Sequence, residues 1–94
     1  MGSVIMRAVI TVIGRDRVGI IAGISNILAD CNVNILDISQ TIMQDVFTMI
    51  MLTEVSNANV AFDALSDTLD AKGRELELYV KIQHEDIFNS MHRI

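Results

Sequence analysis

The run Met6–Ile13, MRAVITVI, constrains the fold more than any other stretch of this chain. It is almost uniformly apolar and rich in β-branched residues, which is typical of a strand buried on both faces. Such a strand needs a neighbouring strand on each side and other elements packed on both of its faces. The 94 residues are 51% hydrophobic and 20% charged, so the chain has the size of one domain and the composition for a packed core. We expect a single domain over residues 6–94, preceded by an N-terminal extension at residues 1–5.

Apolar residues at three- and four-residue spacing then predict a helix over residues 18–30. A second strand follows over residues 33–43, where Val33 and Ile35 alternate with Asn34. The alternation slips afterwards, which predicts a β-bulge near Leu36 and Asp37. Gln44 and Asp45 lie between two strand-like runs and predict a tight hairpin turn into a third strand over residues 46–55.

The segment SNAN, residues 56–59, offers Ser56, Asn57 or Asn59 as the N-cap of a second helix. Gly73 fits the position just after that helix, where glycine accepts a left-handed backbone. Alternation over residues 76–82, LELYVKI, predicts the last strand. The tail from His84 predicts a short terminal helix with grouped apolar residues, namely Ile87, Phe88 and Met91.

The predicted order is therefore β-α-β-β-α-β with a short C-terminal helix. This order indicates an α+β fold of the ferredoxin-like type: a four-stranded antiparallel sheet with both helices on one face. The opposite face then needs cover of its own. Thr11 and Ile13 lie on it, together with the set of either Phe47 or Thr48, depending on register.

Charge and composition exclude several classes of function. The formal net charge is −5, whereas nucleic-acid binding needs clustered Lys and Arg. Aromatic residues make up 4% of the chain, which leaves no stacking platform for single strands. The single cysteine, Cys31, has no partner for an intrachain disulfide and fits a small buried residue at a helix end. With no signal peptide and no long apolar run, we expect a cytoplasmic protein without membrane contact.

Other candidate chemistry is sparse. His84 and His92, near Glu85 and Asp86, lie eight positions apart without a third close ligand, so we predict no metal site and no cofactor. The first loop lacks the CxxC of a metal chaperone and the three glycines of a dinucleotide loop. An acylphosphatase-like enzyme using Arg15 or Arg17 with Asp16 is a remote alternative, because no nucleophile or base is positioned there.

The loop after the first strand, GRDRVG at residues 14–19, is the remaining candidate site. Gly14 ends the strand, and the backbone N–H groups that open the following helix attract a carboxylate or phosphate. Asp16 can accept from an ammonium group, while Arg15 and Arg17 add positive charge. The loop fits either a free amino acid or a solvated helix start with no ligand.

The stretch Ala8–Gln40, AVITVIGRDRVGIIAGISNILADCNVNILDISQ, strongly resembles the first half of an ACT domain. Those domains carry a loop of the type G-x-D-[RK]-x-G-[ILV], then an amphipathic helix and a [CG]-x-N-I motif. The matching residues are Gly14, Asp16, Arg17, Gly19, Ile20, Asn34 and Ile35. Over residues 6–94 the chain is similar to the small free-standing ACT proteins of bacteria and archaea.

The resemblance implies a homodimer in which two sheets join side by side and an amino acid binds at the subunit interface. In that arrangement the loop from Gly14 to Ile20, including Val18, supplies backbone donors to the ligand carboxylate. Asp16 holds the amino group, and the segment Asn34, Ile35 and Leu36 of the neighbour closes the pocket.

The resemblance thus implies a non-catalytic regulatory module that signals to a separate protein partner. The alternative is a purely structural dimerisation or adaptor domain that binds no ligand. Resemblance to the regulator of glycine cleavage, which has ACT domains, makes control of transcription conceivable, although this chain has no DNA-binding surface of its own.

Overall fold

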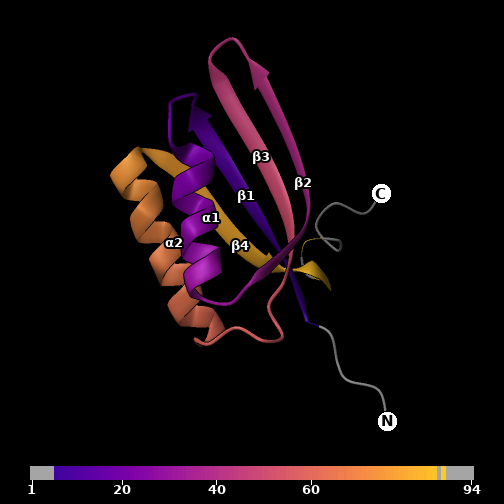
Figure 1. Ribbon diagram of the computed structural model, residues 1–94. Coiled ribbons are helices and arrows are strands. Elements are labelled where there is room, and N and C mark those ends of the chain that lie inside the picture. The colour runs from indigo at the N-terminus through magenta and orange to yellow at the C-terminus, as the bar shows by residue number, and fades with distance from the viewer. Residues whose placement is uncertain (1–5, 87, 89–94) are drawn as a thin grey trace.

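A computed structural model describes residues 6–86 and 88 and shows the predicted order of strands and helices. The elements are β1 (Arg7–Arg15), α1 (Ile20–Asp30), β2 (Asn34–Met43), β3 (Val46–Glu54), α2 (Phe62–Leu76) and β4 (Leu78–His84). The four strands form one antiparallel sheet, and both helices lie on the same face of it (Figure 1). The ferredoxin-like α+β prediction is confirmed.

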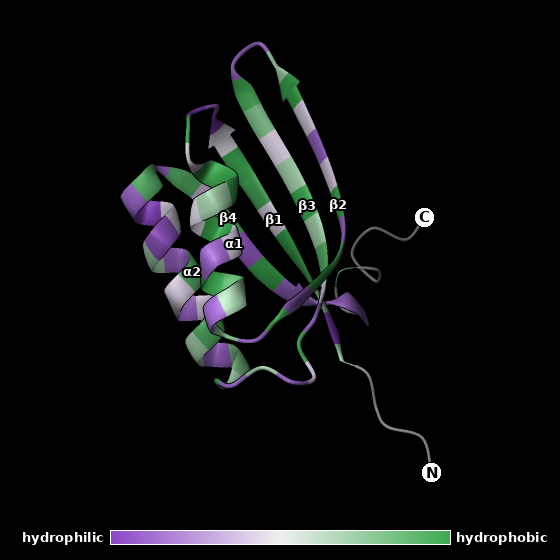
Figure 2. Ribbon diagram, in the orientation of Figure 1, coloured by the Kyte–Doolittle hydropathy of each residue, from purple (hydrophilic) through white to green (hydrophobic). Residues whose placement is uncertain are grey.

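The strand order in the sheet is β2-β3-β1-β4, so β1 lies between two partners while β2 and β4 are edges. Ala8, Ile10 and Val12 of β1 are fully buried on the helix-covered face. Apolar residues of both helices and of β3 and β4 pack against them, and Figure 2 shows the apolar colouring concentrated along the sheet. The Met6–Ile13 run is therefore the centre of the core, as its composition predicted.

The bulge in β2 is confirmed, because the register to β3 shifts between Ile35 and Asp37. Its effect is to keep three isoleucines of β2 on the same face. Ile35, Ile38 and Ile42 pair with Thr53, Met51 and Phe47, respectively, and those three β3 residues are all buried beneath the helices. The extra residue thus converts the slipped sequence alternation into one continuous row facing the helix side.

The predicted hairpin turn at Gln44 and Asp45 is also confirmed. Both residues have positive φ, 49° and 72°, which matches the twist of the flanking strands. Register then decides which β3 set faces away from the helices. Phe47 is buried in the core, and Thr48 pairs with Ile13, which places the Thr48 set on the uncovered face.

The predicted N-caps of α2 are wrong. The helix begins at Phe62 with Ala61 as its N-cap, and no side chain caps it. Ser56 and Asn59 are used elsewhere: the Ser56 hydroxyl accepts from the Met6 N–H at 2.7 Å, and the Asn59 amide donates to the Asp30 carbonyl at 2.9 Å. These bonds hold the 55–61 loop against β1 and the end of α1, so the helix starts later.

The predicted helix end at Gly73 is wrong as well. The helix continues to Leu76, and Glu77 takes the left-handed position that closes it, with φ of 59°. Gly73 is instead a buried contact with β4. A Cβ there would lie 2.9 Å from the Leu78 carbonyl oxygen and 2.9 Å from Val80 Cγ2.

After β4, the described residues Glu85, Asp86 and Phe88 are helical, and the rest of the predicted C-terminal helix lies outside the described residues. In the part of the chain that the structure describes, neither helix has the length and apolar character to cross a bilayer.

Two glycine substitutions test the contact between α2 and β4. Gly73→Ala is expected to destabilise the fold by about 1–3 kcal/mol, because the new methyl group meets a backbone carbonyl that has little room to move. Gly23→Ala in α1 is the matched control. Its Cβ meets only flexible side chains, Leu76 at 3.3 Å and Lys72 at 3.7 Å, so the usual gain in helix stability, about 0.5–1 kcal/mol, should dominate. Urea unfolding measures both, and equal effects would contradict the account.

Candidate functional site

The loop predicted as a ligand site connects β1 to α1. Gly14 and Arg15 are the last residues of β1, which therefore runs two residues beyond the predicted strand end. Ile20 is the first residue of α1 and is buried, whereas Val18 is fully exposed. The centre of the loop is thus exposed, and its Ile20 end is anchored in the core.

Two hydrogen bonds hold the loop in place. The Asp16 N–H donates to the Asp45 carbonyl at 2.8 Å, which ties the loop to the β2–β3 hairpin turn. The Arg17 guanidinium donates to the Leu76 carbonyl at 2.8 Å and lies 3.7 Å from the Glu77 carboxylate. Arg17 therefore caps the end of α2. Among the described residues, the side chains of Arg15 and Asp16 have no such bond, so these two remain available to a ligand.

Gly19 determines the start of α1. It is the N-cap in a left-handed conformation, with φ of 95°, and no side chain caps the helix. The first helical bond runs from the Gly23 N–H to the Gly19 carbonyl at 2.8 Å. The N–H groups of Ile20 to Ala22 precede that bond and have no partner within the helix. These donors face the loop end and suit a carboxylate.

The second predicted segment, Asn34 to Leu36, lies at the other end of the sheet. Asn34 pairs with Glu54 at the end of β3, whereas Gly14 pairs with Phe47 at its start. Seven residues of strand separate these levels, which corresponds to roughly 23 Å. One chain therefore does not bring its two predicted half-sites together.

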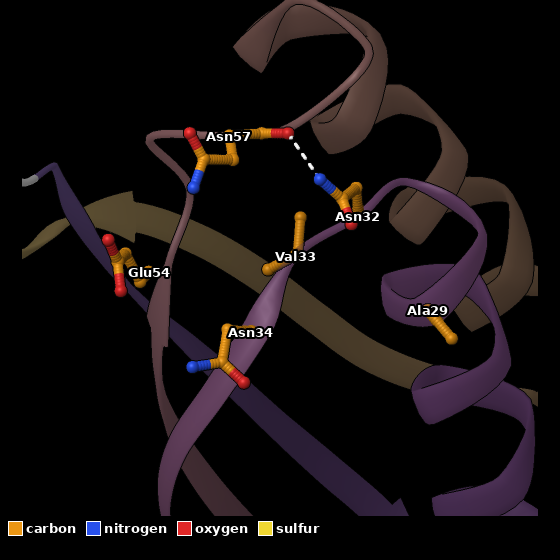
Figure 3. A pocket seen from close by; sticks show the side chains of 6 residues that line it. All are labelled: Ala29, Asn32, Val33, Asn34, Glu54 and Asn57. Atoms are coloured by element: carbon orange, nitrogen blue, oxygen red, sulfur yellow. Dashed lines mark hydrogen bonds between the residues drawn. The ribbon is translucent and has the colours of Figure 1, made fainter.

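The Asn34 end contains a cavity of about 420 Å³ (Figure 3). It is lined by Ala29, Asn32, Val33, Asn34, Glu54 and Asn57. The Asn32 amide donates to the Asn57 carbonyl at 2.9 Å and closes one wall. Among the described residues the Glu54 carboxylate makes no hydrogen bond or ion pair, although Arg7 is its cross-strand neighbour. The lining side chains thus offer amide and carboxylate oxygens.

Comparison with known proteins identifies the family. The profile described as "ACT domain" matches residues 6–83, most of the chain. A UPF0237 protein from Clostridium acetobutylicum is 62% identical over 89 residues, which are 95% of this chain and 100% of that protein. The chain belongs to the ACT-domain family.

Solved structures agree with this assignment. An ACT domain protein from Streptococcus pneumoniae is 40% identical, with a TM-score of 0.76 over 88% of this chain and 93% of that one. A putative glycine cleavage system transcriptional repressor is 27% identical, with a TM-score of 0.76 over 87% of this chain and 47% of that one. ACT domains are commonly regulatory modules that bind amino acids.

Sequence reasoning missed part of the polar cavity in this ACT domain. Asn57 was a candidate helix cap, Glu54 lies inside the predicted third strand, and Asn32 belongs to none of the predicted motifs. Only the register that pairs Asn34 with Glu54 brings these side chains together. The one available signal was the concentration of amide side chains in CNVN and SNAN, at residues 31–34 and 56–59.

The remaining candidates lie elsewhere. Cys31 is a free, partly buried thiol at the end of α1. His84 stacks on Phe62 with ring centroids 4.1 Å apart and links β4 to α2. His92 lies outside the described residues. Across residues 6–86 and 88, no group of three or more His, Cys, Asp or Glu side chains is arranged to hold a metal ion.

Gly19 provides a test of the loop. Gly19→Ala is expected to cost about 1–2 kcal/mol of stability, because a Cβ is strained at positive φ even though no atom lies within 4 Å of it. Gly19→Asn should recover part of that loss, since asparagine tolerates the left-handed region. Urea unfolding of the two variants measures the difference. If alanine were as stable as glycine, backbone conformation would not be what holds the loop.

Proposed function

We propose that this ACT domain forms a side-by-side homodimer through β2, binds a small amino acid at the interface, and passes that state to a separate protein. The binding site is composite. One protomer contributes the loop from Gly14 to Ile20, and its partner contributes Asn34 to Leu36. Arg15, Asp16, Val18 and the donors of α1 lie on the loop side.

The observation that carries the proposal is the exposed edge of β2. Most of this strand is uncovered: Leu36, Ile38, Ile42 and Met43 each remain 40% or more exposed. From Asp37 to Met43 the pairing to β3 is regular and the strand contains no Lys, Arg or Pro. Natural edges usually carry such residues to prevent pairing with another chain. The absence of these residues over this stretch supports pairing of the edge with a second protomer.

Antiparallel pairing of two β2 edges about a two-fold axis explains the separated half-sites. It places the Met43 end of one strand beside the Asn34 end of the other. The Asp16–Asp45 hydrogen bond attaches the loop to the hairpin turn just beyond Met43. The loop of one protomer and the Asn34 end of its partner then meet at the same end of a continuous sheet.

The two half-sites have complementary chemistry for a zwitterion. The α1 N-terminus and Arg15 present donors and positive charge to a carboxylate. Asp16 from the same loop and the Asn34 and Glu54 oxygens from the partner present acceptors to an ammonium group. A free amino acid carries both groups a short distance apart, so it satisfies both half-sites at once.

A non-catalytic role fits the side chains present. Among the described residues, no hydrogen bond joins a Cys, Ser or Thr side chain to a His or carboxylate, the pairing that activates a nucleophile. The structural similarity to the putative glycine cleavage system transcriptional repressor also supports a regulatory role.

A dimerisation unit without a ligand is the second candidate, and the loop's own bonds favour it. Arg17 and the Asp16 N–H serve the fold directly, so a loop of this shape is explained in part without any ligand. The two candidates share the dimer and differ only in binding.

Ile38→Lys tests the dimer. A charge on the helix-facing side of β2 should block edge pairing and convert the dimer to a monomer, as measured by sedimentation velocity. Val60→Lys, in the loop before α2, replaces a similarly exposed aliphatic residue away from both edges and should remain dimeric. A dimer that persists in Ile38→Lys would place the interface elsewhere.

Calorimetric titration with each of the twenty amino acids tests the ligand. We expect one small amino acid to bind, and Asn34→Ala or Asp16→Ala to weaken it at least tenfold. Glu75→Gln on α2, where Glu75 pairs with Lys72, is the control and should bind normally. A dimer that binds none of the twenty would support the purely structural candidate.

A further inference from the structure

The polar cavity at the Asn34 end contains more hydrogen-bonding side chains than the ligand's ammonium group needs. In the proposed composite site that group binds Asn34 and Glu54. Asn32 and Asn57 line the same cavity of about 420 Å³ and have no part in the proposed function so far. Figure 3 shows Asn57, Glu54 and Asn34 on one side of the cavity and Ala29 of α1 on the other.

Asn32 is required by the fold. Its φ of 58° lies in the left-handed region, which asparagine tolerates better than most other residues. Its amide donates to the Asn57 carbonyl at 2.9 Å. Backbone conformation and this hydrogen bond therefore account for an asparagine at position 32 without a ligand.

The fold does not require an asparagine at position 57 in the same way. The φ of Asn57 is not positive, and among the described residues its side chain makes no hydrogen bond. Its backbone is nevertheless held firmly. The Asn57 carbonyl accepts from Asn32, the Ser56 hydroxyl accepts from a main-chain N–H at 2.7 Å, and the Asn59 N–H donates to the Cys31 carbonyl at 3.0 Å. A fixed segment thus presents the Asn57 amide to the cavity.

We infer that Asn57 selects the ligand, which is an amino acid with an uncharged side chain that donates and accepts hydrogen bonds, namely a hydroxyl or a carboxamide. The inference rests on the proposed composite site, in which the ligand's side chain extends into the partner's cavity. The Asn57 carboxamide offers both donors and an acceptor. A hydroxyl or a second carboxamide can therefore pair with it in either sense.

Other classes of side chain fit this cavity less well. An aliphatic side chain would remove water from the Asn57 amide without replacing its hydrogen bonds, which weakens binding. An acidic side chain would bring a second negative charge close to Glu54. Because the ligand's ammonium group already uses Glu54, no lining carboxylate remains for a cationic side chain.

Calorimetric titration of the dimer with amino acids of similar shape tests the inference. The pairs are serine with alanine, threonine with valine, asparagine with leucine, and glutamine with methionine. We expect the tightest ligand among the twenty to be the polar member of one pair. It should bind about tenfold or more tightly than its apolar counterpart, because the counterpart leaves the Asn57 amide unsatisfied.

A variant of similar volume assigns this preference to one residue. Asn57→Leu should weaken binding of the polar ligand and remove the difference within the pair. Asn26→Leu, at an exposed position of α1 outside the cavity lining, is the matched control and should keep the difference. The readout is a ratio of two affinities, so a general loss of stability does not imitate the effect. Sedimentation verifies that each variant is a dimer.

Two results would overturn the inference. One is a tightest ligand other than serine, threonine, asparagine or glutamine. The other is an unchanged affinity ratio in Asn57→Leu. Either result leaves the proposed amino-acid site intact, whereas a dimer that binds none of the twenty contradicts the proposed function and this inference with it.

Discussion

Two helices cover only part of a four-stranded sheet, and this shortage of cover determines the surfaces of the molecule. α1 and α2 bury the side chains of β1 and β3 that face them, but they leave most of β2 exposed and do not contact the opposite face of the sheet. Apolar residues on both uncovered surfaces raise the free energy of an isolated chain in water. We propose that a second protomer covers the β2 edge.

Much of the fold could be predicted from sequence because its signals are local. Alternation and helical spacing yielded all six elements in order, and the slip after Ile35 predicted the bulge. The errors lie where tertiary contacts compete. Ser56 and Asn59 bond to distant backbone rather than capping α2. Gly73 is small because β4 passes close to it, a requirement that no pattern within the helix reveals.

The site was predictable in its parts and not in its arrangement. Gly19 was identified from the resemblance of its loop to ACT domains, and its φ of 95° explains why glycine stands there. Sheet register determines how far the loop lies from Asn34. It places them at opposite ends of the sheet within one protomer. The same register brings Glu54 to the cavity, and no sequence motif marks this residue. The proposed composite site between two protomers would bring these positions together.

Mixing two defective dimers tests the composite site most directly. A loop variant, Asp16→Ala, and a strand variant, Asn34→Ala, should each fail to bind the amino acid as homodimers. In an equal mixture that exchanges subunits, each heterodimer contains one intact site, so titration should recover about a quarter of the wild-type sites. If no binding returned once sedimentation and native mass spectrometry had shown that heterodimers formed, the half-sites would belong to one chain or to different ligands, and the account would be wrong.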